Sequence, residues 1–177
     1  SFKEGEINGI PVKVFRISFT GELSFEINTP ARYGIQLWEV LIKNGNQFGL
    51  TPYGTEAMHV LRAERGFIIV GQETDGTVSP IDLGMDWIIS KKKKDFIGKR
   101  SLTRSDTSRE DRKQLVGIIP LDKSEFIEEG QHVVECERLP NPIKKPVEYL
   151  GHVSSSYHSP NLNHCIAMAM IKGGNKL

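Results

Sequence analysis

Apolar and polar side chains alternate near the start of the chain in the manner of paired β-strands. The segment Pro11–Phe19 has a period of two and predicts one strand. Leu23, Phe25 and Ile27 alternate with polar residues and predict a second strand. Because Thr20-Gly21-Glu22 between them includes a glycine that can adopt a positive φ, we expect a tight turn and therefore a β-hairpin.

Two helices are predicted to follow the hairpin. Thr29 has a side chain suited to an N-cap, Pro30 suits the first helical position, and Gly45 suits the end of the helix. The apolar stripe of this helix consists of Ile35, Leu37, Trp38, Leu41 and Ile42. A second helix is predicted from Thr55, as its N-cap, to Gly66.

The pattern changes several times after the second helix. Residues 67–70 are apolar and predict a short buried strand, whereas residues 71–82 are rich in turn-forming residues and predict a surface loop. A short element is expected at residues 85–90. Residues 101–113 are dense in Ser, Thr, Asp and Arg without an apolar period, so we expect a linker or a solvated helix there and a domain boundary after it.

The rest of the chain contains strand-like runs separated by Pro, Gly, Asn and Ser, which favours a small antiparallel barrel. These runs are Leu115–Ile119, His132–Cys136, Val147–Val153 and Ile166–Ile171. The sequence therefore predicts an α+β fold. An antiparallel sheet with two helices is expected over residues 1–113, followed by a small antiparallel β-barrel over residues 114–177.

Composition and charge narrow the classes of function. The 177 residues are 38% hydrophobic and 25% charged, as in an ordinary globular protein. A net charge of +1 gives no global field to attract nucleic acid or anionic lipid, so neither is expected as a partner. The apolar runs are too short to cross a bilayer, which favours a cytoplasmic location. Cys136 and Cys165 lie in apolar contexts, so we expect two buried, reduced thiols.

Glu26 is the first candidate for chemistry. It alternates with Phe25 and Ile27, so its carboxylate faces either solvent or a cavity. Alternation alone favours solvent. Only a cavity would give this carboxylate a function.

Three histidines near the C-terminus invite a metal hypothesis. His152, His158 and His164 are spaced by six residues, which matches neither a helical face nor the usual zinc pairs. A loop containing Ser159, Pro160 and Asn161 explains the composition without a metal. No metal site is predicted.

Several motifs occur in order along almost the whole chain. They are Phe19-Thr-Gly-Glu followed by Phe25-Glu26, the stretch GTEAMHVLRAE at residues 54–64, DFIGK at residues 95–99, and GHVSSS at residues 151–156. This set resembles the aminomethyltransferase family of folate-binding proteins, which includes the glycine-cleavage T-protein. Within the family, residues 51–62 and 68–77 are most similar to the alpha subunits of heterotetrameric sarcosine oxidases.

The resemblance implies a folate site. It implies that Glu26 accepts hydrogen bonds from the pterin ring of tetrahydrofolate, that Phe19 stands where T-proteins usually carry Tyr, and that Trp87 is an aromatic residue of the pocket. Trp87 can equally be a core aromatic at the end of a strand. Met58 replaces an Arg that meets folate in T-proteins, so the folate carboxylates need another cation. Lys91–Lys94 could attract a glutamate tail, although a solvated turn is the favoured interpretation.

The resemblance also implies a fragment of a larger enzyme. The chain starts abruptly at Ser1, and the family's key Asp lies in an amino-terminal half that we expect to precede it, so no catalytic residue is assigned to this chain. The parent would be an oxidoreductase acting on the CH–NH group of sarcosine. FAD or FMN and NAD would be bound elsewhere in the complex, and beta, gamma and delta subunits would be the partners.

The module itself would hold tetrahydrofolate, which accepts the one-carbon unit of sarcosine to form 5,10-methylenetetrahydrofolate, and the fragment alone would be inactive. A T-protein-like aminomethyltransferase and a non-catalytic scaffold with a folate-binding fold are the alternatives, because fold does not determine function.

Overall fold

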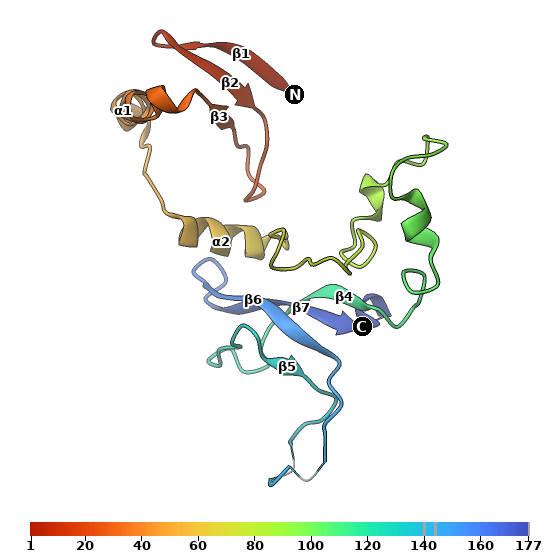
Figure 1. The fold of residues 1–177 in the computed structure, drawn as a ribbon. Helices are drawn as coiled ribbons and strands as arrows, with labels where there is room; N and C mark the ends of the chain where they lie inside the picture. The colour runs from red at the N-terminus through yellow and green to blue at the C-terminus, as the bar shows by residue number, and fades with distance from the viewer. Residues whose placement is uncertain (140, 144, 177) are drawn as a thin grey trace. The chain divides into compact units, whose positions relative to one another are not determined.

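The computed structural model describes residues 1–139, 141–143 and 145–176. The chain divides into two compact units, Ser1–Phe67 (unit 1) and Ile68–Leu177 (unit 2). Each unit contains one antiparallel sheet (Figure 1). The predicted domain boundary after residue 113 is a different division and stays a prediction.

The sheet of unit 1 has the strand order β1-β2-β3. Its strands are β1 (Phe2–Ile7), β2 (Ile10–Phe15) and β3 (Glu26–Asn28). Strands β1 and β2 are joined by Asn8 and Gly9, which have φ values of 52° and 77°, as expected in a two-residue hairpin turn. The hairpin of unit 1 is therefore formed by β1 and β2.

Helix α1 (Gly34–Gly45) covers one face of this sheet. It follows the 3₁₀ helix η1 (Ala31–Tyr33) and precedes η2 (Asn46–Phe48). Ile10 and Val12 of β2 pack with Leu37 of α1 to form the buried core of the unit. Helix α2 (Thr55–Glu64) completes the described helices of unit 1.

The antiparallel pairing predicted between Pro11–Phe19 and residues 23–27 is present, because β2 pairs with β3, but the tight turn predicted at Thr20-Gly21-Glu22 is wrong. Strand β2 ends at Phe15, β3 begins at Glu26, and the intervening residues form an irregular loop. Within the loop, the Gly21 amide donates to Ser18 Oγ at 2.8 Å. This local hydrogen bond stabilises a turn in place of a strand ladder.

Both helices are present, but the capping prediction at Thr29 is wrong. The Thr29 hydroxyl donates to the carbonyl of Pro11 at 2.9 Å, and Pro30 precedes η1 without a side-chain cap. Helix α2 starts at Thr55 with Gly54 as its N-cap, and Gly66, just beyond its end, has a φ of 68°. Thr29 thus connects the start of the helical segment to β2.

The four-stranded sheet of unit 2 has the order β4-β7-β6-β5 and curls into part of a barrel. Its strands are β4 (Lys113–Ile118), β5 (His132–Val133), β6 (Gly151–Ser159) and β7 (His164–Lys172). Three short 3₁₀ helices complete the unit: η3 (Asp86–Ile88), η4 (Lys99–Thr103) and η5 (Gly174–Lys176). The predicted α+β fold with antiparallel sheets is confirmed.

The strand boundaries of unit 2 correct the sequence pattern in two places. Residues 67–70 form no strand, and Val70 is 83% exposed. The third barrel strand is predicted at Val147–Val153 but runs from Gly151 to Ser159, because the buried serines at positions 154, 155, 156 and 159 continue it. Ser154 Oγ lies 3.2 Å from both the Met168 carbonyl oxygen and Glu73 Oε1, and its one hydroxyl proton is shared between these acceptors, so a strand of polar composition is satisfied inside the sheet.

The segment predicted as a surface loop at residues 71–82 contains buried polar residues. Glu73 is 1% exposed and accepts hydrogen bonds from the Ile69 amide at 2.7 Å and from the Ser154 and Ser155 hydroxyls. Asp82 is 2% exposed and accepts from the Ser79 amide at 2.8 Å. Turn-forming composition therefore identified an irregular backbone but not its burial.

Arg112 connects this loop to the segment before β4. Its guanidinium donates to Asp82 Oδ2 at 2.8 Å, to Asp106 Oδ2 at 2.7 Å and to the Thr77 carbonyl at 2.6 Å. Burial raises the pKa of the Asp82 carboxyl, but hydrogen bonds from Arg112 and Ser79 outweigh burial and hold the pKa below its usual value. The expected linker at residues 101–113 is thus fixed at its end by an ion pair.

Cys136 and Cys165 are both free thiols. Cys165 is buried, as predicted, whereas Cys136 is exposed, which corrects the expectation of two buried thiols. Cys136 follows β5, which is only two residues long, so the strand ends before it reaches the cysteine.

Gly151 marks a close approach between β6 and β7. A Cβ atom at this position would lie 1.9 Å from the carbonyl oxygen of Met170, and backbone cannot move aside cheaply. We expect Gly151→Ala to destabilise the protein by about 1–3 kcal/mol, measured by urea denaturation. Gly117→Ala, in β4 of the same sheet, has no heavy atom within 4 Å of the new Cβ and is the control. Equal destabilisation by both variants would contradict this prediction.

Candidate functional site

Glu26 lies on the face of the unit 1 sheet that α1 does not cover. It pairs across the ladder with Phe15, which in turn pairs with Phe2, while the neighbouring Ile27 packs against the core. The rings of Phe2 and Phe15 are stacked with centroids 5.5 Å apart. The structure therefore places an exposed carboxylate beside Phe15, whose ring stacks on that of Phe2 one strand further away.

Asn28 orients the Glu26 carboxylate. Its Nδ2 donates to Glu26 Oε1 at 2.8 Å along the same face of β3. Among the residues that the structure describes, none donates to the other oxygen, Oε2. Sequence reasoning did not single out Asn28, although its position two residues after Glu26 on the same strand face was a usable signal.

A groove with a volume of about 450 Å³ adjoins the carboxyl-terminal end of β3, at Asn28. Asn28 contributes to its wall as well as contacting Glu26. The remaining lining residues are Glu4, Gly5, Pro11, Val12, Lys13, Thr29 and Pro30. Lys13 pairs with Glu4 at 2.7 Å, so charge in the groove is partly balanced.

Phe19 lies in the loop between β2 and β3 and is 39% exposed. Arg65, just after α2, donates to Glu22 Oε1 at 3.4 Å, and its side chain passes close to Gly21. The pKa of the Glu22 carboxyl lies below its usual value, chiefly because of a hydrogen bond from Thr20. Arg65 therefore contacts the loop that carries Phe19, a contact that the sequence pattern did not reveal.

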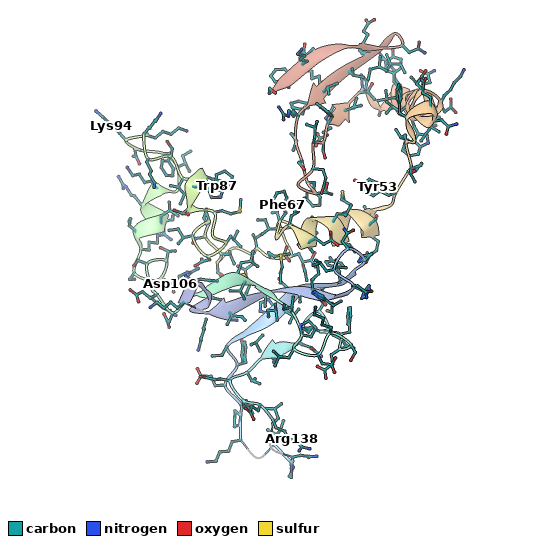
Figure 2. The ribbon with its side chains drawn as sticks, turned by 180° about the vertical axis from the view of Figure 1, so that it is seen from behind. Tyr53, Phe67, Trp87, Lys94, Asp106 and Arg138 are labelled. Atoms are coloured by element: carbon teal, nitrogen blue, oxygen red, sulfur yellow. The ribbon has the colours of Figure 1, made fainter. Side chains whose placement is uncertain are left out.

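Trp87 belongs to η3 in unit 2 and is 74% exposed (Figure 2). Its interpretation as a core aromatic is therefore wrong. Met58, on α2, is half-buried. Arg62, one turn later, is fully buried and donates to the Phe67 carbonyl at 3.0 Å, which is a structural contact.

The three C-terminal histidines lie on strands and not in a loop. His152 and His158 are on β6, and His164 is on β7 with its Nδ1 2.7 Å from the carbonyl oxygen of Cys165. Within residues 1–139, 141–143 and 145–176, no three His, Cys, Asp or Glu side chains are grouped as metal ligands. In the same residues, no helix has the length and apolar character needed to cross a membrane.

Sequence models of known families cover nearly the whole chain. Residues 1–93 match the model described as the GCVT N-terminal domain, and residues 113–176 match the glycine cleavage T-protein C-terminal barrel domain. The chain belongs to the glycine cleavage T-protein family. The motifs at residues 19–26, 54–64 and 151–156 and the site residues named above lie within the two matched regions.

Relatives within this T-protein family include subunits of an oxidase. The chain is 52% identical over 167 residues to the sarcosine oxidase subunit alpha of Corynebacterium sp. (strain U-96), covering 94% of this chain and 17% of that protein. It is 38% identical to the corresponding subunit of Rhizobium meliloti (strain 1021), covering 91% of this chain and 16% of that protein. It therefore spans about one sixth of these relatives.

The family also includes aminomethyltransferases. The chain is 32% identical to the enzyme of Desulfitobacterium hafniense (strain DSM 10664 / DCB-2), covering 96% of this chain and 43% of that protein. The crystal structure of the glycine cleavage system aminomethyltransferase T from Bartonella henselae matches with a TM-score of 0.75 and 24% identity, covering 91% of this chain and 42% of that one. The T-protein fold is therefore shared.

Proposed function

We propose that the chain is the carboxyl-terminal, tetrahydrofolate-binding part of a sarcosine oxidase alpha subunit. The 52% identity to the Corynebacterium subunit over 94% of the chain carries this proposal. Identity at this level, with family motifs retained in order, supports a shared function more strongly than the fold does.

Glu26 is the proposed pterin ligand. A reduced pterin presents an amino group and ring N–H groups along one edge, and an ionised carboxylate can accept two of them with charge-assisted strength. Asn28 donates to one oxygen of the exposed Glu26 carboxylate, and Phe15, which stacks on Phe2, is its neighbour across the ladder. This arrangement supports a planar heteroaromatic ligand that is bound by its edge.

Phe19 is proposed to complete this contact. It offers an apolar surface next to the loop contact of Arg65, and it retains ring packing without the hydroxyl of a tyrosine. Its task is to orient the ring and to limit its contact with water. Trp87 is an exposed indole in unit 2, and its proposed role in folate binding rests on the family resemblance alone.

When bound, tetrahydrofolate supplies the nucleophilic nitrogen that accepts the one-carbon unit of sarcosine to form 5,10-methylenetetrahydrofolate. The proposal assigns binding and orientation to this chain and proton transfer to an Asp of the amino-terminal half. The flavins and NAD are assigned to other parts of the complex, which also includes the beta, gamma and delta subunits. The chain alone is therefore expected to be inactive.

The proposal is tested on the complete oxidase with sarcosine and oxygen. With tetrahydrofolate present, 5,10-methylenetetrahydrofolate should form in proportion to sarcosine oxidised, and free formaldehyde should fall correspondingly. Isothermal titration of tetrahydrofolate gives the affinity independently of turnover. Formaldehyde release that does not respond to folate, together with no measurable folate binding, would contradict the proposal.

A T-protein-like aminomethyltransferase is the second candidate, because the 32% identity to the Desulfitobacterium enzyme extends over 96% of the chain. It predicts one-carbon transfer to folate from the aminomethyl donor of glycine cleavage, without any oxidation of sarcosine. Comparing the two donors in one folate-dependent assay separates the candidates.

A further inference from the structure

The side-chain nitrogen of Asn28 carries two hydrogens, and one of them has a partner in unit 1. Asn28 Nδ2 donates to Glu26 Oε1 at 2.8 Å. The amide must turn its nitrogen toward Glu26 and its oxygen away, because an ionised carboxylate only accepts hydrogen bonds. Across residues 1–139, 141–143 and 145–176, no group accepts the second Nδ2 hydrogen. Asn28 therefore retains one donor for a ligand.

Strand β3 places this donor directly beside the Glu26 carboxylate. Glu26 and Asn28 are two residues apart on the strand, so their side chains leave the same face of the sheet. Lys13 lies opposite Asn28 on β2, but its ammonium group pairs with Glu4 on β1 at 2.7 Å. The groove of about 450 Å³ has Asn28 in its wall and leaves room next to the amide.

The two side chains present hydrogen-bonding groups in a defined order. Oε2 and Oε1 of Glu26 are two acceptors, and the second Nδ2 hydrogen of Asn28 is a donor that follows them. A carboxylate oxygen has two lone-pair sites, so Oε1 can accept from Asn28 and from a ligand together. An edge that matches this order must present donor, donor and acceptor.

The 2-amino-4-oxo edge of a pterin has that complementary order. It consists of the 2-amino group, the N3–H group and the 4-oxo oxygen. The first two are the donors that Glu26 is proposed to accept, and the third is an acceptor that Asn28 can meet. A 2,4-diamino pteridine has an amino group in place of the oxygen, so it would turn a donor toward the donor of Asn28.

We propose that Asn28 is a specificity-determining residue of the folate site, which donates to the 4-oxo oxygen and selects 4-oxo over 4-amino pteridines. This inference rests on the proposed function, because it needs the pterin edge at Glu26. One Nδ2 hydrogen positions Glu26, and the other recognises position 4 of the ring. Selection follows because a 4-amino group leaves the Asn28 donor unpaired in the complex.

The test measures the affinities of two ligands for the full-length subunit by isothermal titration. The ligands are tetrahydrofolate and 4-amino-4-deoxytetrahydrofolate, in which an amino group replaces the 4-oxo oxygen. Asn28→Ala removes the donor, and Asn28→Asp replaces the amide nitrogen by an oxygen without changing the shape of the side chain.

Asn44→Ala is the matched control. Asn44 is also an exposed asparagine of unit 1, and its Nδ2 donates to the Val40 carbonyl at 2.8 Å. It belongs to α1, which covers the sheet face opposite Glu26. All three variants change exposed side chains, so their thermal unfolding should stay near that of the wild type.

We expect the wild type to bind tetrahydrofolate at least roughly tenfold more tightly than the 4-amino analogue. Asn28→Ala should bind tetrahydrofolate roughly tenfold more weakly and the analogue almost as the wild type does, so the preference is lost. Asn28→Asp should favour the analogue, because its oxygen can accept from the 4-amino group. Asn44→Ala should keep the affinities of the wild type.

Two results would overturn the role of Asn28 and leave the proposed function standing. One is tetrahydrofolate binding by the wild type without a preference over the analogue. The other is a preference that survives in Asn28→Ala, including the case in which both affinities fall equally, as a merely structural role predicts. No tetrahydrofolate binding by the wild type would instead contradict the proposed function and this inference with it.

Discussion

We expect Glu26→Gln to lower the tetrahydrofolate affinity of the full-length subunit by roughly ten- to a hundredfold. The amide replaces one carboxylate oxygen by a donor that opposes a ring N–H, and loss of a charge-assisted contact costs about 1.5–3 kcal/mol. Folding should barely change, because Glu26 is exposed on the sheet face opposite the core. Isothermal titration and thermal unfolding measure the two effects separately.

Glu6→Gln is the matched control for this substitution. Glu6 is an exposed carboxylate on the same sheet face as Glu26. It lies at the far end of β1, opposite Pro11, whereas Phe2 at the near end lies opposite Phe15, the partner of Glu26. It should leave folate affinity unchanged. If Glu26→Gln kept full affinity and lost stability, the carboxylate would be structural and the pterin ligand would have to be sought elsewhere.

Asp82→Asn is expected to destabilise the protein by about 3 kcal/mol at neutral pH, the lower end of the cost of breaking a buried ion pair. The substitution removes the charge that Arg112 contacts at 2.8 Å and leaves the guanidinium, which is only 11% exposed, with Asp106 and the Thr77 carbonyl. Urea denaturation measures the change. Asp111→Asn, which breaks the exposed pair with Arg109, should leave the unfolding midpoint unchanged.

The effect of Asp82→Asn should depend on pH in a defined direction. The folded-state pKa of Asp82 lies below the ordinary value of 3.8, so its stabilisation is fully present above that value and is lost as pH falls through the folded-state pKa. The difference in free energy of unfolding between wild type and variant should therefore be constant near neutrality and shrink in acid, below about pH 3.8. A difference that grew on acidification would contradict this linkage.

The helices and central strands of the barrel could be predicted because their patterns report local geometry. The apolar stripe around Leu37 and the apolar run of β7 each bury one continuous surface. The first strand, Phe2–Ile7, was missed because its polar residues leave it almost wholly exposed. It belongs to the sheet through backbone pairing with β2, which side-chain patterns do not record.

Buried polar residues explain most of the remaining differences. The sequence pattern predicts a loop at Ser154 and Ser155, because serine favours turns. In the structure both hydroxyls are buried in unit 2 and contact the Glu73 carboxylate. Asp82 and Arg112 are thirty residues apart and read as solvent-exposed charges. Their pairing depends on tertiary contacts that no local pattern contains.

The residues of the candidate site were only partly predictable from the sequence. Glu26 and Phe19 are proposed from motifs that resemble the family, and the structure adds the sheet face of Glu26 and its cross-strand neighbour Phe15. Asn28 and Arg65 were not identified, because their roles follow from hydrogen bonds across a strand face and between a loop and the end of a helix. These contacts affect the orientation of the candidate residues, and the pattern of apolar and polar positions in the sequence does not reveal them.

The connection between β6 and β7 has a kinetic consequence. Only residues 160–163 separate these two long paired strands, whereas β4 precedes β6 by many residues and pairs with β7 from its other side. Closing a short loop loses less chain entropy, so the β6–β7 ribbon should gain protection first during refolding and β4 should join it later. Pulsed hydrogen exchange can order these events, and protection of β4 amides ahead of those that bond β6 to β7 would reverse the sequence.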